Sequence, residues 1–257
     1  MAICEQFKRR SGGVLADCVG IIDGTRVDIL GPQYDRASYF DWKKVYSIVF
    51  LVIVDYSGRV LWLSHAAPGC VNDVNLAGLS KLDEGVVNLR AIADRESLFL
   101  IGDGGFSLRP HLVIPFDETD IKKRRNQSLL RRFNRFFSGI RCTVERVLGV
   151  VKGRWRCILG GLRVRIKSAD SSNNHRKLAM RIIQSCFILH NFSLVHDGGW
   201  DAVWGRFQNE VPNVAEAIRL ASEEVIETKT EHLSLETLVN GQKLRDNLLE
   251  MYNIRFE

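Results

Sequence analysis

The chain has 257 residues, of which 46% are hydrophobic and 26% charged, which is ordinary for a soluble globular protein of one or two domains. This composition excludes a disordered polyelectrolyte, and the longest apolar run, residues 48–54, is too short to cross a bilayer. Residues 1–10 lack the apolar core of a signal peptide, so we expect an intracellular protein without membrane attachment. Six scattered cysteines without Cys-x-x-Cys spacing predict reduced thiols rather than a zinc site.

The net charge of +6 is distributed unevenly along the chain. Residues 122–167 hold 15 Lys and Arg against one acid, Glu145. A basic segment of this density indicates a polyanionic partner, with nucleic acid first, although a solvated helix face is the simpler alternative. From residue 197 onward the chain turns acidic, with six basic and twelve acidic residues. We expect residues 197–257 to form a helical extension that shields the basic segment or docks a partner.

The first half of the chain reads as short strands. Residues 1–16 are predicted to be a lead-in with little structure, and residues 17–196 the main domain. The apolar run 18–22 stops at Asp23-Gly24-Thr25, the pattern of a buried strand with a carboxylate at its end. Residues 45–65 predict a hairpin that turns at positions 56–58, with its first strand covered on both faces.

A second strand end of the same kind follows a predicted helix. Asn72 or Asp73 can cap a helix that includes Leu76 and Leu79. The apolar run 98–101 then ends at Asp103, which is surrounded by glycines that leave open space beside its carboxylate. Such space suits a metal ion, whereas the simpler interpretation is an ordinary Asp-Gly turn. Residues 112–114 predict one more short strand.

The second half changes to helical periodicity. Apolar positions recur at helical spacing from residue 127 to residue 151 and place Glu145 on a helix. A loop is expected at residues 173–174, followed by a helix over residues 178–195, with further helical patterns near 214–228 and 244–252. His190 and Asn191 are read as core and end-cap residues rather than ligands. The element order predicts an α/β fold, a mixed five-stranded sheet flanked by helices.

Three carboxylates could form one centre if the fold brings them together. Asp23 and Asp103 would lie on adjacent strands, and Glu145 would face them from a helix. Like charges at short range raise one another's pKa, so three ionised carboxylates need a compensating divalent ion. Oxygen ligands without Cys or His favour Mg²⁺ or Mn²⁺. Two such ions about 3.5 to 4 Å apart can activate a nucleophile and stabilise the leaving oxygen of a phosphodiester.

Several motifs in register resemble those of PIF/Harbinger DDE transposases and the nucleases derived from them. They occupy residues 19–25, 68–73, 101–108 and 144–156, followed by 179–192 and 241–246. The resemblance implies an RNase H-like core in which Asp23, Asp103 and Glu145 bind two divalent ions and cut DNA in the nucleus. It also implies a separate DNA-binding protein as partner and allows a homo-oligomer.

The same motifs suggest secondary candidates. Asp73 resembles an acid of the family and is a second-tier metal or supporting residue, although a helix N-cap is its simplest role. Basic side chains near Glu145 could hold the DNA backbone, and each could equally be a plain surface charge. These candidates are Arg141, Arg146, Lys152, Arg154 and Arg156.

The chain also departs from the family pattern beside its acids. Arg26 and Asn72 stand where relatives usually carry His, residues 104–106 replace Ser-Gly-Tyr, and Phe137 occupies another usual His position. Our first hypothesis is a divalent-metal-dependent DNA endonuclease that hydrolyses phosphodiester bonds by a two-metal mechanism. The departures favour the alternative, a domesticated, catalytically inactive nuclear scaffold that binds DNA or protein. A third, weaker hypothesis is a phosphatase-like or RNA-directed hydrolase.

Overall fold

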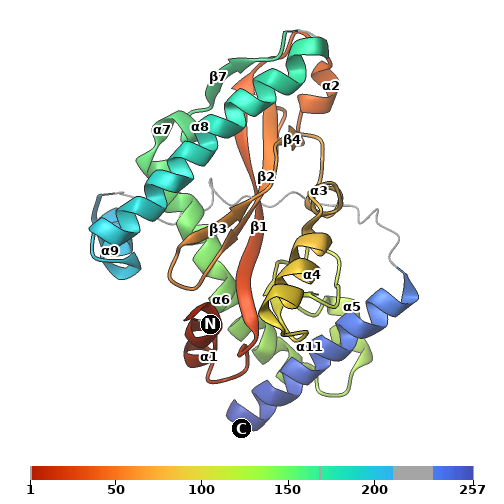
Figure 1. Ribbon diagram of the computed structural model, residues 1–257. Helices are drawn as coiled ribbons and strands as arrows, with labels where there is room; N and C mark the ends of the chain where they lie inside the picture. Colours follow the sequence, from red (N-terminus) through yellow and green to blue (C-terminus); the bar gives the residue numbers. More distant parts are fainter. Residues whose placement is uncertain (1, 168, 211–233, 257) are drawn as a thin grey trace.

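The computed structural model describes residues 2–167, 169–210 and 234–256, and its centre is a seven-stranded mixed sheet (Figure 1). The main path through the sheet runs β3-β2-β1-β5-β6, while β4 pairs with β2 and β7 with β1. The strands are β1 (Cys18–Leu30), β2 (Ser47–Val54), β3 (Val60–Leu63), β4 (Ala67–Pro68), β5 (Phe99–Ile101), β6 (Leu112–Val113) and β7 (Leu162–Arg165). The mixed sheet agrees with an RNase H-like fold and confirms the predicted fold class, with two short strands, β4 and β7, beyond the five expected.

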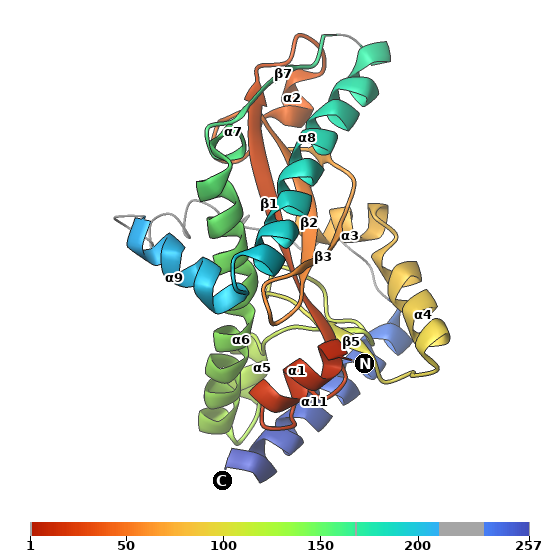
Figure 2. The same ribbon diagram turned by 60° about the vertical axis from the view of Figure 1, so that its left-hand side comes forward.

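Ten helices within the described residues surround this sheet. They are α1 (Ala2–Arg10), α2 (Arg36–Tyr39), α3 (Asp73–Leu79), α4 (Leu82–Ala93), α5 (Glu118–Lys123), α6 (Gln127–Arg154), α7 (Arg156–Leu159), α8 (Ala169–His196), α9 (Trp200–Glu210) and α11 (Leu235–Phe256). The helices α6 and α8 cover one face of the sheet, and α3 and α4 cover the other (Figures 1 and 2).

Strand alternation explains this two-layered core. Ile21, Phe50 and Ile101 point to the α6 side, where they join a cluster that includes Val144 and Val147. The intervening strand residues belong to a second cluster with α3 and α4. Because successive strand side chains point to opposite faces, the nearly continuous apolar runs of β2 and β5 supply both cores.

Strand β1 corrects the prediction that Asp23 ends a strand. The strand continues for 13 residues, and Asp23 pairs with Val52 of β2 in an antiparallel ladder that extends to Asp28. Asp-Gly-Thr has turn propensity, but the ladder with the fully buried strand β2 keeps these residues extended. Asp23 therefore lies in the middle of the central strand.

The predicted hairpin is confirmed as β2 and β3, and helix α8 holds it in place. The Asn191 amide accepts from Val60 N–H and donates to Val60 C=O, both at 2.8 Å. His190 is fully buried with Nε2 at 2.9 Å from the Gly58 carbonyl oxygen, and burial lowers its pKa to about 4. His190 is thus a core residue as predicted, while Asn191 anchors the hairpin rather than capping a helix.

Two local predictions were wrong. The segment 1–16 contains helix α1, whose Phe7 is fully buried in the main core, so it is more than an unstructured lead-in. Residues 173–174 lie inside α8 rather than in a loop. Helix α8 is long and apolar enough to cross a membrane by length and composition alone, yet Ile183 and Phe187 pack it into the core of the sheet domain.

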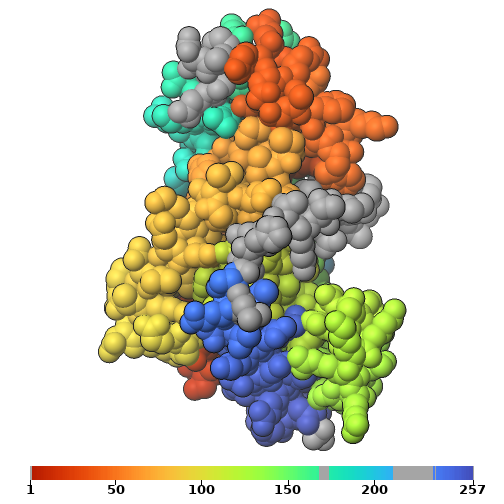
Figure 3. Space-filling model, turned by 90° about the vertical axis from the view of Figure 1, so that its right-hand side faces the viewer, coloured from red at the N-terminus to blue at the C-terminus, as the bar shows by residue number. Residues whose placement is uncertain are grey.

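Part of the predicted acidic extension also belongs to the folded core. The ring of Tyr252 on α11 packs against Phe133 with centroids 5.7 Å apart. Arg245 of α11 pairs with Asp120 of α5 at 2.6 Å. In Figure 3 this blue helix lies between the yellow segment of α4 and the yellow-green segment of α5. The helical pattern expected at 214–228 falls outside the described residues.

Candidate carboxylate centre

Asp23 and Asp103 come together because β1 and β5 run in parallel. The register pairs Ile21 with Ile101, the last residue of β5, so the two aspartates follow at matching positions two residues later. The same alternation places both on the sheet face covered by α6. Their exposed fractions are only 5% and 7%. The predicted pairing of these two acids is present in the structure.

The hydrogen bonding of the two carboxylates is incomplete. Asp23 Oδ1 accepts the Gly24 N–H at 2.9 Å, while its Oδ2 is buried without a hydrogen-bond partner among the described residues. Asp103 Oδ1 accepts the Gly105 N–H at 3.0 Å. A Cβ at Gly105 would lie 3.1 Å from that oxygen, so glycine allows the close backbone approach. One buried carboxylate oxygen thus remains available for a cation.

The electrostatics of this pair disfavour two free negative charges. Burial raises the pKa of Asp23 well above its ordinary value, and the charges of Asp103, Asp73 and Glu145 raise it further. Burial also raises the pKa of Asp103, against the opposing effect of Arg141 and of backbone N–H groups. A cation bound between the two carboxylates would offset both the cost of burying their charges and their mutual repulsion.

Glu145 reaches the centre from helix α6, but Arg141 holds it. The guanidinium of Arg141 lies 2.6 Å from Glu145 Oε1, one helical turn away. Both side chains are largely covered, at 13% and 19% exposed. The Arg141 charge also lowers the pKa of Asp23 and of Asp103. Arg141, which the sequence suggested as a DNA contact, therefore serves as counterion of the acidic centre in this structure.

Asp73 approaches the centre through Gly24. It is the first residue of α3, and the N-cap is Asn72, whose Oδ1 accepts the Asn75 N–H at 2.9 Å. A Cβ at Gly24 would overlap the Asp73 carboxylate, so the glycine makes room for this acid. The N-cap role proposed for Asp73 therefore belongs to Asn72, whereas Asp73 adds negative charge near Asp23.

A cation fits this centre only in part. Among the described residues no three Asp, Glu, His or Cys side chains are grouped as a metal-ligand set. Asp23 and Asp103 nevertheless offer neighbouring buried carboxylates with one unpartnered oxygen, and oxygen donors of this kind suit Mg²⁺ or Mn²⁺. Glu145 becomes a third ligand only when its pair with Arg141 opens.

The remaining predicted DNA contacts do not form one surface with the acids. Lys152 is buried, at 5% exposed, and desolvation lowers its pKa to about 7, which is at odds with a direct phosphate contact. Arg146 stacks over the Trp204 ring of α9 at 5.5 Å, and Arg154 lies 3.6 Å from Asp197. Arg156 is exposed. Two of the five candidates interact electrostatically with Asp23: the charge of Arg141 lowers the pKa of Asp23, and the charge of Asp23 raises the pKa of Lys152.

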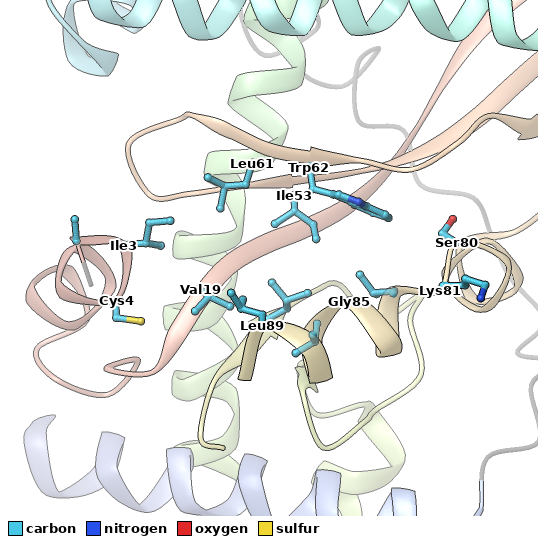
Figure 4. Close-up of a pocket in the computed structure, with 14 residues that line it drawn as sticks. Ile3, Cys4, Val19, Ile53, Leu61, Trp62, Ser80, Lys81, Gly85 and Leu89 are labelled. Carbon is cyan, nitrogen blue, oxygen red and sulfur yellow. The ribbon is translucent and has the colours of Figure 1, made fainter. Parts of the chain in front are cut away.

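The acids lie outside the apolar cavity shown in Figure 4. This cavity of 670 Å³ opens between the sheet and α4, with Ile53, Trp62 and Leu89 on its walls and Cys4 of α1 at one end. None of the described residues that line it is a carboxylate or a histidine.

A mixed sheet with acids on neighbouring strands and a third acid on a crossing helix defines an RNase H-like domain with a carboxylate centre. The chain belongs to the DDE superfamily endonuclease family, whose model matches residues 22–191. This range includes Asp23, Asp103 and Glu145, and the match confirms the family resemblance seen in the motifs.

Similar proteins from animals and plants agree with this assignment. The chain is 27% identical over 203 residues to "Putative nuclease HARBI1" of Bos taurus, covering 79% of this chain and 52% of that protein. It is 29% identical over 188 residues to the mouse protein of that name, covering 72% and 48%. For "Protein ALP1-like" of Arabidopsis thaliana the identity is 28% over 200 residues, covering 74% and 45%. The chain thus spans about half the length of these relatives, and no solved structure matches it.

Proposed function

We propose that the chain is the catalytic domain of a divalent-metal-dependent DNA endonuclease of transposase descent. The observation that carries this proposal is the pair Asp23 and Asp103, which are buried together with raised pKa values and an unpartnered Oδ2 atom. Two buried carboxylates side by side are costly in a folded protein, and a bound divalent cation would offset this cost more fully than the single charge of Arg141. Membership of an endonuclease family supports the same conclusion.

The proposed roles follow from where each acid lies. Asp23 and Asp103 would hold one Mg²⁺ or Mn²⁺, and Asp23 with Glu145 would hold a second if Glu145 were released from Arg141. Bound divalent ions supply an activated nucleophile and stabilise the leaving oxygen of a phosphodiester. The chain's own contribution is to fix one carboxylate on strand β1 and the other just beyond the end of strand β5, and to exclude water from Asp23.

The substrate and setting extend this proposal. The basic segment 122–167 supports DNA as the substrate, because cations that neutralise phosphates provide most of the affinity for nucleic acid. We place the activity in the nucleus, with a separate DNA-binding protein that selects the target and with assembly into a homo-oligomer. The names of the nuclease relatives support the substrate class.

Plasmid cleavage tests the catalytic assignment directly. Supercoiled plasmid incubated with the protein and Mg²⁺ or Mn²⁺ should be nicked, and Asp103→Asn should reduce the rate at least about a hundredfold, since a metal ligand is lost. Asp201→Asn, which removes an exposed carboxylate on α9, is the matched control and should cleave at the wild-type rate. Equal rates for wild type and Asp103→Asn would reject the assignment.

One observation favours a second function. The Arg141–Glu145 ion pair neutralises the third acid without a metal, which suits a domesticated scaffold that binds DNA or protein and does not cut. Calorimetry separates the two functions. Heat of Mn²⁺ binding that disappears in Asp23→Asn supports the nuclease, whereas a wild-type protein that binds no divalent ion supports the scaffold.

A further inference from the structure

A cationic groove lies along the edge of the sheet where helix α8 passes strands β3 and β4. It has a volume of 610 Å³. One wall consists of residues 63–68 with Leu79, and the other is formed by α8. The polar groups of the α8 wall are Arg176, Lys177, Arg181 and Gln184, and none of the described lining residues is acidic.

The cations of this groove are uncompensated within the described part of the chain. Arg176, Lys177 and Arg181 form no salt bridge with a described carboxylate, and the Nε atom of Arg176 is buried without a hydrogen-bond partner there. Lys177 and Arg181 are also one helical turn apart, a spacing at which like charges repel. An anionic ligand would relieve this repulsion.

The position of the groove relates it to the carboxylate centre. Strand β2 separates β3 from β1, which carries Asp23, and neighbouring strands lie about 5 Å apart. The groove therefore lies on the same domain as the acids, about two strand widths from Asp23 and about three from Asp103 in the sheet. Duplex DNA carries one charge per about 1.7 Å of its axis, so a bound duplex presents further phosphates over such a distance.

We propose that this groove binds the phosphate backbone of DNA and holds the flank of the duplex whose other part reaches Asp23 and Asp103. Lys177 and Arg181 contact phosphate oxygens from α8, and the positive charge of Arg176, which also lines the groove, attracts the same backbone. His65, exposed on the opposite wall, borders the path. This proposal rests on the proposed function for the choice of DNA as the anion, but binding in the groove needs neither metal nor cleavage.

Fluorescence anisotropy with a labelled DNA duplex in EDTA tests the groove without catalysis. The double variant Lys177→Ala/Arg181→Ala should bind at least about fivefold more weakly, and the slope of log K against log salt should shrink by roughly 1.8, or 0.9 per lost phosphate contact. The control is Lys8→Ala/Lys243→Ala, which removes the same charge from exposed positions on α1 and α11. It should bind within twofold of wild type.

The conservative variant Lys177→Arg/Arg181→Lys should bind like wild type, which excludes a folding defect as the cause of weak binding. Wild-type affinity and salt slope in the alanine variant would overturn the proposal, as would an equal loss in the control. If the wild-type protein bound an RNA duplex more tightly than DNA, and Lys177→Ala/Arg181→Ala weakened that binding as well, the choice of DNA as the ligand would be wrong. The anisotropy assay contains no divalent ion, so a wild-type protein that binds DNA through the groove but cuts no plasmid would reject the nuclease and leave the groove proposal standing, and loss of cleavage and loss of groove binding are separate results.

Discussion

Replacing Arg141 tests whether this arginine occupies the place of a metal ion. The variant Arg141→Gln keeps a polar, though shorter, side chain but removes the positive charge that faces Glu145. In metal-free buffer the carboxylates would lose their counterion, so we expect the variant to be less stable than wild type. With Mn²⁺ present, the same change should strengthen metal binding, because it removes a competing cation.

The ion-pair geometry sets the size of this effect. Arg141 Nη2 lies 2.6 Å from Glu145 Oε1, and a metal ion bound to that oxygen would sit about 2.1 Å from it. The guanidinium nitrogen would then be about 4.7 Å or less from the ion. A doubly charged ion and a single charge at this distance repel by about 2 kcal/mol at the dielectric constant of water and about 7 kcal/mol at an effective value of 20. Even the smaller repulsion corresponds to roughly thirtyfold in affinity.

Isothermal titration with Mn²⁺ measures this difference. Arg141→Gln should bind Mn²⁺ at least about twentyfold more tightly than wild type, at the lower limit of the Coulomb estimate. Arg146→Gln is the matched control, since Arg146 is on the same helix but stacks over Trp204. This variant should bind Mn²⁺ within twofold of wild type. In thermal melts in EDTA, the melting temperature of Arg141→Gln should be lower than that of wild type and that of Arg146→Gln.

Two results would refute this reasoning. Equal Mn²⁺ affinities for wild type and Arg141→Gln would show that the guanidinium does not compete with the ion. Weaker binding by the variant would show that Arg141 positions Glu145 for the metal rather than withholding it. In that case the variant Glu145→Gln should lose affinity to the same extent, and the acidic centre would need its arginine.

Three further predictions address the groups around the centre. Because burial holds the folded-state pKa of Asp23 above its unfolded value near 3.8, its ionisation costs stability as pH rises above about 4. In EDTA, Asp23→Asn should therefore melt a few degrees higher than wild type at pH 7.5 and equally at pH 3.5, and a lower melting temperature at pH 7.5 would contradict this. Lys152 should titrate near pH 7 in side-chain NMR. Its resonance is identified as the one that disappears in Lys152→Ala. A titration near 10.5 would show that the ammonium group is not buried. Asn191→Ala should lower stability by about 1 to 3 kcal/mol in chemical denaturation because Val60 loses both amide partners, and an unchanged midpoint would show that α8 does not hold the hairpin.

The acids could be found from the sequence because their environments are local. Asp23 and Asp103 each follow a short apolar run, and such runs form strands that carry their final residues to one edge of a sheet. Their pairing depends on two strands that are 80 positions apart, and only the family motifs pointed to it. What sequence could not show was the extension of β1 beyond Asp23, because its ladder with β2 is a tertiary interaction that overrides local turn propensity.

Charge counting was less informative than helix geometry in the basic segment. Fifteen cations in residues 122–167 suggested one exposed basic face, yet they point in several directions. Arg141, Glu145, Leu148 and Lys152 recur at helical spacing, and Leu148 is fully buried. The same spacing places Arg141 and Lys152 toward the core with Glu145, and that periodicity was readable from the sequence. Arg146 lies on another side of the helix, against Trp204.

Arg141 also decides which function the geometry permits. A nuclease site needs three acids that are free to bind cations, whereas a scaffold needs acids that are neutralised without them. The structure shows two buried acids, Asp23 with one unpartnered oxygen and Asp103, and a third, Glu145, that is paired with Arg141. Since the guanidinium and a divalent ion repel each other, occupancy of the metal site and opening of the ion pair must be coupled. A metal that binds without releasing Glu145 would leave a one-ion site, and cleavage should then be insensitive to Glu145→Gln.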